Sequence, residues 1–255
     1  MWPASKVVPK ELFPLGRVPA IVHLVWELLD AGIRRIVVVV AAETSAEMRG
    51  LFDPGIRAPE KIANDPLVQR FQQIFEKAEF IRVVEQPAKY GNGIPLIAAA
   101  AWIETAPCIY AFGDDIVFGE NVSRGLLNIF ARTGCPVLAA QEVEPSRKSQ
   151  FGIIECKKED DGIQYLTRLI EKPSPDETAS KLASFGRYLV TPDLVEMLQK
   201  TPAGRDSEVW FVDSVIQRLR EGRRVCAFTL TAGKWYTVGD PTSYAQAVAA
   251  AQING

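Results

Sequence analysis

The sequence predicts an α/β fold with a Rossmann-like, mostly parallel sheet flanked by helices, and a smaller β-rich region. Helical and strand-like segments alternate over the first ~140 residues, which is typical of a doubly wound sheet. Residues 36–40 are an unbroken β-branched run, which favours a strand buried on both faces of a parallel sheet. With 255 residues, 47% of them hydrophobic, the chain can bury one large core or two small ones.

The first half of the chain contains the regular alternation. Apolar residues at helical spacing predict a helix over residues 18–31, with Pro19 in its first turn and Gly32 at its carboxyl end. Asp65 and Pro66 predict the start of a second helix, as its cap and first-turn residue. The further elements expected here are that helix to residue 78, helices over 94–104 and 122–133, and strands over 36–40, 80–84, 108–112 and 136–140.

The second half has a different texture, because short strands between Pro, Gly and charged turn residues dominate after Glu142. We expect a β-rich insertion over the sheet and then a return of helices, all within one domain. The expected strands are 151–156, 164–170, 185–190 and 225–230, and the expected helices are 192–199, 209–221 and 241–252.

Composition excludes several classes of function. The formal net charge of −2, with both signs interspersed, gives no basic footprint for nucleic acid. His23 is the only histidine, which excludes a histidine-based triad or zinc site and favours a structural role in an apolar helix. The four cysteines are widely spaced and are expected to be reduced, and no apolar run reaches membrane-spanning length, so we expect a cytoplasmic protein.

Two aspartates follow the predicted strand 108–112. Asp114 and Asp115 would therefore lie at the carboxyl edge of the sheet, where a hard cation such as Mg²⁺ accepts oxygen ligands and bridges phosphates. An aspartate that caps the following turn explains the same pattern equally well. Both interpretations stay open at this point.

Other turns carry weaker signals of chemistry. Gly91 and Gly93 lie between a strand and a helix, where backbone N–H groups can approach a base or phosphate, although most such turns are only turns. Lys10 lies in a Pro-punctuated segment that holds an irregular backbone, and it is either a phosphate ligand or a solvated surface lysine. Lys172 and Glu208 have the same ambiguity.

Residues 1–15, MWPASKVVPKELFPL, resemble the second half of the signature G-x-G-T-R-x-x-P-x-[ST]-K-x-x-P-K-E-x-x-P. This signature is typical of sugar-1-phosphate nucleotidyltransferases, and the similarity is closest to the UTP–glucose-1-phosphate uridylyltransferases. It extends over nearly the whole chain, since E-K-P at 171–173 and the segments 185–188 and 207–208 match later motifs in order. The resemblance implies the nucleotide-diphospho-sugar transferase fold, with a nucleotide-binding region over residues 1–142 and a sugar-binding region with C-terminal helices over residues 143–255.

The resemblance also implies roles for individual residues. Asp114 would bind the metal, and Asp240 is a candidate second ligand because Thr237 stands where the family has an aspartate. Lys10 and Lys172 would contact the reacting phosphates as catalytic residues. The nucleotide-binding set is Gln86, Gly91, Gly93 and Asp114, and the sugar-binding set is Gly152, Glu171, Lys172, Gly186 and Glu208.

The implied reaction is transfer of a nucleotidyl group from an NTP, expected to be UTP, to a sugar 1-phosphate, expected to be glucose 1-phosphate, with Mg²⁺ as cofactor. The products are an NDP-sugar and pyrophosphate. The expected partners are these two substrates, with neither nucleic acid nor membrane, and a homo-oligomer is an expectation from the family.

The G-x-G-T-R portion of the signature does not occur ahead of the matching segment. In the family this loop cradles the triphosphate, so we expect weak triphosphate binding by these 255 residues. This departure, together with Thr237, keeps a second interpretation open. The chain would then be a non-catalytic homologue that binds a sugar phosphate or nucleotide sugar and acts through a partner.

Overall fold

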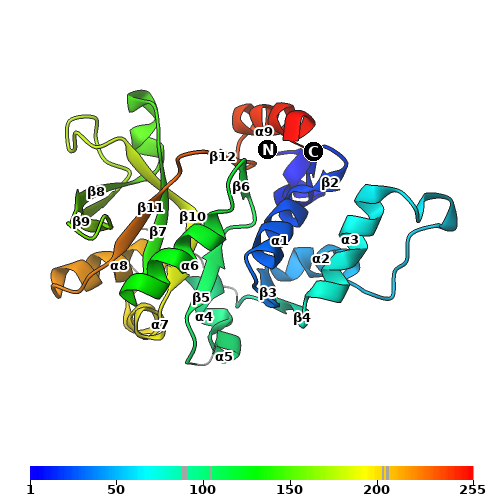
Figure 1. Cartoon of the computed structure of the whole chain (residues 1–255), viewed down its shortest axis with the longest axis horizontal. Helices are drawn as coiled ribbons and strands as arrows, with labels where there is room; N and C mark the ends of the chain where they lie inside the picture. The colour runs from blue at the N-terminus through cyan, green and yellow to red at the C-terminus, as the bar shows by residue number, and fades with distance from the viewer. Residues whose placement is uncertain (88–90, 104, 203, 205–206, 255) are drawn as a thin grey trace.

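The protein is described by a computed structural model that covers every residue except 88–90, 104, 203, 205–206 and 255. Helices α1, α2 and α3 gather with strands β3 and β4 on one side, and a larger sheet with α6, α7 and α8 lies on the other (Figure 1). The last helix, α9, returns to the N-terminal segment, where the Tyr244 hydroxyl donates to the carbonyl oxygen of Pro14 at 2.9 Å (Figure 1). The predicted alternation of helices and strands is confirmed.

The first side is built from a short parallel ladder covered by helices. Strand β3 (Arg35–Val40) pairs only with β4 (Phe80–Glu85) among the described strands, through six residue pairs in parallel. Val38 and its neighbours two residues away are buried, whereas Val37 and Val39 are half-buried, so the run has one fully covered face rather than the two expected. The helices here are α1 (Ala20–Asp30), α2 (Ser45–Leu51) and α3 (Pro66–Lys77).

The second side contains a six-stranded sheet in the order β5-β10-β7-β11-β9-β8. Strands β7 and β11 pair in parallel, whereas the other ladders of this sheet are antiparallel, so the sheet is mostly antiparallel and not mostly parallel as expected. The bounds are β5 (Cys108–Ala111), β7 (Val137–Glu142), β8 (Gly152–Lys158), β9 (Gln164–Glu171), β10 (Leu182–Val190) and β11 (Cys226–Thr229).

This sheet is buried on both faces. Along β7, Leu138 and Ala140 pack into one hydrophobic cluster with α7 (Pro192–Lys200) and α8 (Phe211–Arg220). Val137 and Ala139, which point the other way, pack into a second cluster with α6 (Val122–Thr133). Because side chains alternate across a strand, β7 contributes to the hydrophobic clusters on both faces of the sheet.

Helix ends follow the local signals in the sequence. The Asp65 side chain accepts an N–H from Leu67 at 2.8 Å and caps α3 as predicted. Asn121 caps α6 in the same way through the N–H of Arg124, and Gly134 ends that helix with φ 64°. These short-range interactions explain why the bounds of α6 match the prediction, 122–133.

Four differences from the sequence prediction concern elements with little local signal. The expected helix 94–104 is two short helices, α4 (Ile94–Ala98) and α5 (Ala100–Ile103), and its last residue lies outside the described residues. Val18 and Pro19 form strand β2 ahead of α1. Helix α2 was not expected. Neither was the antiparallel pair of β6 (Asp115–Phe118) and β12 (Lys234–Thr237), which precedes α9 (Pro241–Asn254).

His23 has the structural role expected for it. Its Nε2 lies 3.0 Å from the carbonyl oxygen of Leu15, and its ring packs edge-on against Trp26 and Phe118. Burial lowers the pKa of this imidazole, which favours its neutral form beside the hydrophobic cluster of α1, β3 and β4. None of the helices among the described residues is both long and apolar enough to cross a bilayer.

Candidate active site

Asp114 follows β5 and forms an ion pair with Lys10. The distance from Lys10 Nζ to Asp114 Oδ2 is 2.5 Å, and the two side chains are 38% and 18% exposed. Burial alone would lower the pKa of the lysine, but the attraction and hydrogen bond of Asp114 outweigh it and raise that pKa. The structure therefore brings together the two residues that the sequence singled out for phosphate and metal, although they lie far apart in the chain.

Thr237 and Gly239 border the same space. The backbone N–H of Val238 donates to the carbonyl oxygen of Asp114 at 2.8 Å, which fixes this segment beside the aspartate. A Cβ on Gly239 would lie 3.2 Å from Thr237 Oγ1 and 3.4 Å from Asp114 Oδ2, so the hydroxyl and the carboxylate face one small opening. Only a residue without a side chain keeps that opening free.

Asp240 is engaged at the start of α9, where its side chain accepts the N–H of Ser243 at 2.9 Å. Burial acts to raise the pKa of Asp240, but these hydrogen bonds outweigh it and lower that pKa. Capping of α9 is thus a sufficient structural role for Asp240, and its role as a metal ligand stays a prediction. Among the described residues, no three His, Cys, Asp or Glu side chains gather in a group that could hold a metal ion.

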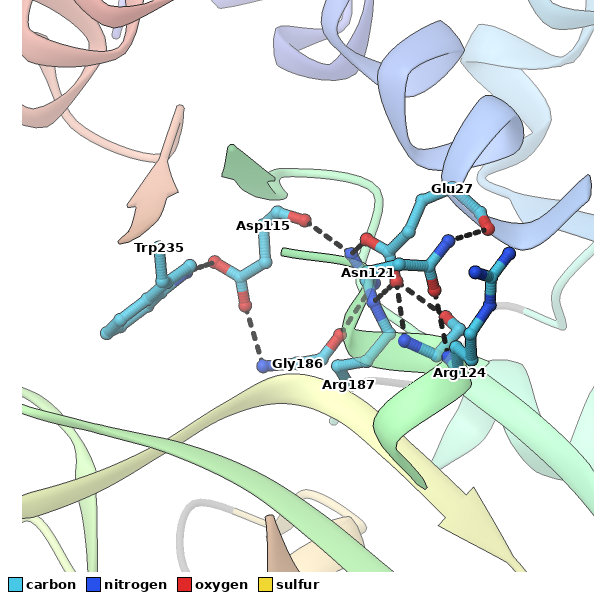
Figure 2. A network of polar contacts seen from close by, with 8 residues as sticks. Glu27, Asp115, Asn121, Arg124, Gly186, Arg187 and Trp235 are labelled. Carbon is cyan, nitrogen blue, oxygen red and sulfur yellow. Dashed lines mark hydrogen bonds and ion pairs between the residues drawn. The ribbon is translucent and has the colours of Figure 1, made fainter. Parts of the chain in front are cut away.

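Asp115 points the opposite way from Asp114, into the protein, and is 6% exposed. Its Oδ2 accepts the backbone N–H of Gly186 at 2.7 Å, and its Oδ1 accepts the indole N–H of Trp235 at 2.8 Å (Figure 2). Burial, followed by the nearby charge of Asp114, raises the pKa of Asp115. The two neighbouring carboxylates therefore have different surroundings, one beside a cation at the site and the other inside.

A buried ion pair lies beneath Asp115. Arg187 is fully buried, and its guanidinium donates to both carboxylate oxygens of Glu27 at 3.2 and 3.1 Å (Figure 2). The same guanidinium donates to the carbonyl oxygens of Asp115 at 3.0 Å and Gly186 at 3.2 Å. Ser123 completes the group, since its hydroxyl and its backbone N–H both donate to Glu27. We call these residues, with Asp115 and Trp235, the seam network because they join α1, β6, α6, β10 and β12.

Gly152, Glu171 and Lys172 lie together at one end of the β8–β9 ladder. Gly152 pairs with Glu171 in the antiparallel register, and a Cβ on that glycine would lie 2.9 Å from Glu171 Oε2. Lys172 has φ 49°, a left-handed conformation that is uncommon for a residue with a side chain. Its Nζ lies 5.3 Å from the centre of the Trp210 ring, in a cation–π contact.

Gly91 and Gly93 pack against the segment that carries Glu208. Gly91 has φ 113°, and a Cβ there would lie 2.2 Å from the carbonyl oxygen of Val209, so both its conformation and the close contact require glycine. The N–H of Gly93 donates to that same oxygen at 2.8 Å. The predicted nucleotide-binding turn thus adjoins the predicted sugar residue Glu208, which is half-buried.

Gln86 stands apart from these contacts. Its backbone N–H donates to the carbonyl oxygen of Val40 at 2.8 Å, directly after β4, and its side chain is half-buried. Residues 88–90, between Gln86 and the glycines of the same segment, lie outside the described residues. A role of Gln86 toward the base therefore stays a prediction.

Several residues at the site have no counterpart in the sequence prediction. Asn92 receives the N–H of Phe211 at 2.8 Å on its side-chain oxygen, and its carbonyl oxygen receives the Tyr110 hydroxyl, so it fixes the turn between Gly91 and Gly93. The neighbouring glycines were a signal that could have found it. No local signal in the sequence could have found Trp210, Trp235 or Glu27, since each contacts a partner that is distant in the sequence.

Comparison with known proteins decides the family. The sequence profile described as nucleotidyl transferase matches residues 1–253. The chain belongs to this family. The family member from Staphylococcus haemolyticus named UTP–glucose-1-phosphate uridylyltransferase is 30% identical over 246 residues, or 95% of this chain and 84% of that one. The enzyme of the same name from Pseudomonas aeruginosa is 26% identical over 251 residues, or 96% and 88% of the two chains.

Solved structures agree with this membership. A UDP-glucose pyrophosphorylase in complex with UDP-glucose superposes with a TM-score of 0.89 at 25% identity and covers 100% of this chain and 94% of its own. The apo form of a UDP-glucose pyrophosphorylase gives a TM-score of 0.91, again at 25% identity, over 99% and 93%. The predicted fold class, that of the nucleotide-diphospho-sugar transferases, is confirmed.

Proposed function

We propose that this protein transfers the uridylyl group of UTP to glucose 1-phosphate and releases UDP-glucose and pyrophosphate. The observation that carries the proposal is the contact of Lys10 with Asp114 beyond the carboxyl end of β5, in a chain similar to these enzymes over nearly all its length. A cation and an oxygen-ligand carboxylate at this edge of a sheet suit phosphate chemistry. The proposal names UTP and glucose because the relatives carry these names.

The reaction needs no nucleophile from the protein. A phosphate oxygen of glucose 1-phosphate attacks the α-phosphorus of UTP in line, and the bond from that phosphorus to the bridging oxygen of pyrophosphate breaks. Lys172 would orient the attacking phosphate, and the cation–π contact of its ammonium group with the Trp210 ring supports this role. The ammonium group of Lys10, which binds Asp114 in the free protein, would stabilise the negative charge that develops on the leaving pyrophosphate or the α-phosphate.

Mg²⁺ belongs to the proposal, and the donors around Asp114 fit it. This ion is commonly held by one or two carboxylates together with substrate phosphates and water, so Asp114 would hold it with the phosphates and water, and the Thr237 hydroxyl is a neutral neighbour. When bound, the ion supplies positive charge to the phosphates. Asp240 stays a proposed second ligand.

The remaining roles follow the same proposal. Gln86, Gly91 and Gly93 would bind the nucleotide within residues 1–142, and Gly152, Glu171, Gly186 and Glu208 would bind the sugar within residues 143–255. The close packing of Gly91 on Val209 supports adjacent binding regions for the two substrates. We also propose a cytoplasmic location, where both substrates occur, and a homo-oligomeric state.

The test is formation of UDP-glucose. Purified protein with UTP, glucose 1-phosphate and Mg²⁺ should release pyrophosphate and UDP-glucose in equal amounts, measured by a coupled pyrophosphate assay and by chromatography. Other sugar 1-phosphates and dTTP serve as competing substrates. Binding of UDP-glucose without any release of pyrophosphate would instead favour the non-catalytic homologue that acts through a partner.

A further inference from the structure

We propose that Asp115 is a positioning residue that fixes the spacing between the phosphate side and the sugar side of the active site. It would do so by holding Gly186 and Trp235 while its chain neighbour, Asp114, faces the phosphates. This inference rests on the proposed function. It concerns the buried aspartate of the pair rather than the one assigned to metal.

The contacts of Asp115 reach both sides of the site. One carboxylate oxygen receives the N–H of Gly186 at 2.7 Å, at the place where the β10 ladder shifts register between Ser184 and Tyr188. The other receives the indole N–H of Trp235 at 2.8 Å, in the strand that leads to Thr237. An irregular strand has fewer ladder bonds to hold it, so a side-chain bond at that point determines where the backbone lies.

The position of Gly186 also depends on close packing. A Cβ there would lie 2.3 Å from Phe112, and the N–H of Phe112 donates to the Gly186 carbonyl oxygen at 2.8 Å. Gly186 is therefore in direct contact with the segment that leads from β5 to Asp114. Any shift of Gly186 would therefore move this part of β10, on the proposed sugar side, relative to Asp114.

Arg187 makes a second set of contacts with the same two backbone segments. Its guanidinium binds the carbonyl oxygens of Asp115 and Gly186 together and is itself held by the Glu27 carboxylate, all within the buried seam network (Figure 2). One planar group with fixed donor directions thus sets the distance between the two backbone segments. Asp115 and Arg187 act on the same pair of segments, one through the N–H of Gly186 and the other through its carbonyl oxygen.

The variant that tests this role is Asp115→Asn, which keeps the size of the side chain. It places an NH₂ group against either the N–H of Gly186 or the indole N–H of Trp235, so one of these two hydrogen bonds is lost. Both substrate regions remain, so KM for UTP and for glucose 1-phosphate should stay within about threefold of wild type. In-line attack depends on alignment, so kcat should fall about 100-fold, the loss known for misplacements near 1 Å. Trp235→Phe removes one donor and keeps the ring stacked on Phe185, where the centroids lie 5.0 Å apart, so its kcat should fall less, by about tenfold.

Glu120→Gln is the matched control. Glu120 is also a carboxylate that holds backbone, since its Oε2 accepts the N–H groups of Thr231, Ala232 and Gly233 at 3.0 Å, but it lies beyond the other end of β6. Its substitution should lower the melting temperature and leave kcat unchanged. Calorimetric titration of each folded variant with UDP-glucose gives a second readout that does not depend on turnover, and its Kd should change by less than tenfold in Asp115→Asn.

The outcomes separate cleanly. A selective loss of kcat in Asp115→Asn, with a smaller loss in Trp235→Phe and none in Glu120→Gln, is the expected result. Asp115→Asn that is folded and as active as wild type overturns this inference alone; if that variant does not fold, an unchanged kcat in Trp235→Phe does so. Wild-type protein without turnover overturns the proposed function, and this inference with it.

Discussion

The two sides of the molecule hold their strands in different ways. On the side of β3 and β4, two parallel strands pair only with each other among the described strands, and helices provide the rest of the core. On the other side, β7 and β10 lie inside a six-stranded sheet and have partners on both edges. A two-stranded sheet depends on its helices for stability, whereas an inner strand also has ladder bonds along both edges.

The proposed active site lies where these two sides meet, so contacts between the two sides determine how its residues are arranged. Lys10 begins a 3-10 turn over Lys10–Leu12 near the N-terminus, and Asp114 follows β5 of the large sheet. Beneath them, Glu27 of α1 binds Arg187 of β10. We therefore expect the geometry of the site to depend on the seam network, which joins elements of both sides.

The largest expected effect is on turnover at the meeting point itself. Asp114→Ala and Lys172→Ala should each reduce kcat/KM by about 10³-fold or more, because each removes a charge that acts on the reacting phosphates. Neither side chain belongs to the core, so the melting temperature should change little. Asp160→Ala, in the exposed turn between β8 and β9, is the control for loss of a carboxylate and should keep wild-type kinetics. A large loss of stability would assign Asp114 or Lys172 a structural role instead.

The next effect is on stability and tests whether the seam network joins the two sides. Arg187→Met leaves the Glu27 carboxylate buried without its cation, and breaking a buried pair in this way costs about 3–5 kcal/mol. The double variant Glu27→Leu with Arg187→Met should recover some of this loss, because it leaves no lone charge. Urea unfolding of the three proteins measures both values. A single-variant loss below about 1 kcal/mol would mean that the sides are joined elsewhere.

A smaller difference concerns the two sheets directly. Amide hydrogen exchange of β3 and β4 should report opening free energies at least about 2 kcal/mol below those of β7 and β10, or roughly 30-fold less protection. We expect the inner strands of the six-stranded sheet to open only when the whole domain unfolds. Mass spectrometry of peptides covering residues 35–40 and 137–142 compares the two sides in one experiment. Equal protection would show that the helices stabilise the short ladder as well as partner strands stabilise the long one.

The sequence predicts the elements that are specified locally. The bounds of α6 follow from Asn121 and Gly134, and the start of α3 follows from Asp65 and Pro66. The pairing of β6 with β12 could not be predicted, because each strand has four residues and its partner is more than a hundred residues away. Pairing at that range is decided by the packing of the whole domain.

The same division applies to the site. Asp114 could be predicted because a carboxylate directly after an apolar strand lies at the sheet edge, and Lys10 because its segment resembles a family signature. The different environment of Asp115 could not, since Asp114 and Asp115 look alike in the sequence. Only the folded chain places Gly186 and Trp235 around the second aspartate.

The smallest expected effect is a pH dependence at the far end of β6. Burial acts to raise the pKa of Glu120, but the three backbone N–H groups of residues 231–233 outweigh it and lower that pKa below its ordinary value of 4.5. The ionised form is therefore favoured by folding, so its contribution is present above pH 4.5 and disappears as the pH falls through the folded-state pKa. Glu120→Gln should melt a few degrees below wild type at pH 7, about 2–4 °C for each kcal/mol lost. The gap between the two melting temperatures should shrink as the pH falls below 4.5 and through the folded-state pKa. A constant gap across this range would mean that the charge of Glu120 does not stabilise the turn that packs on β6.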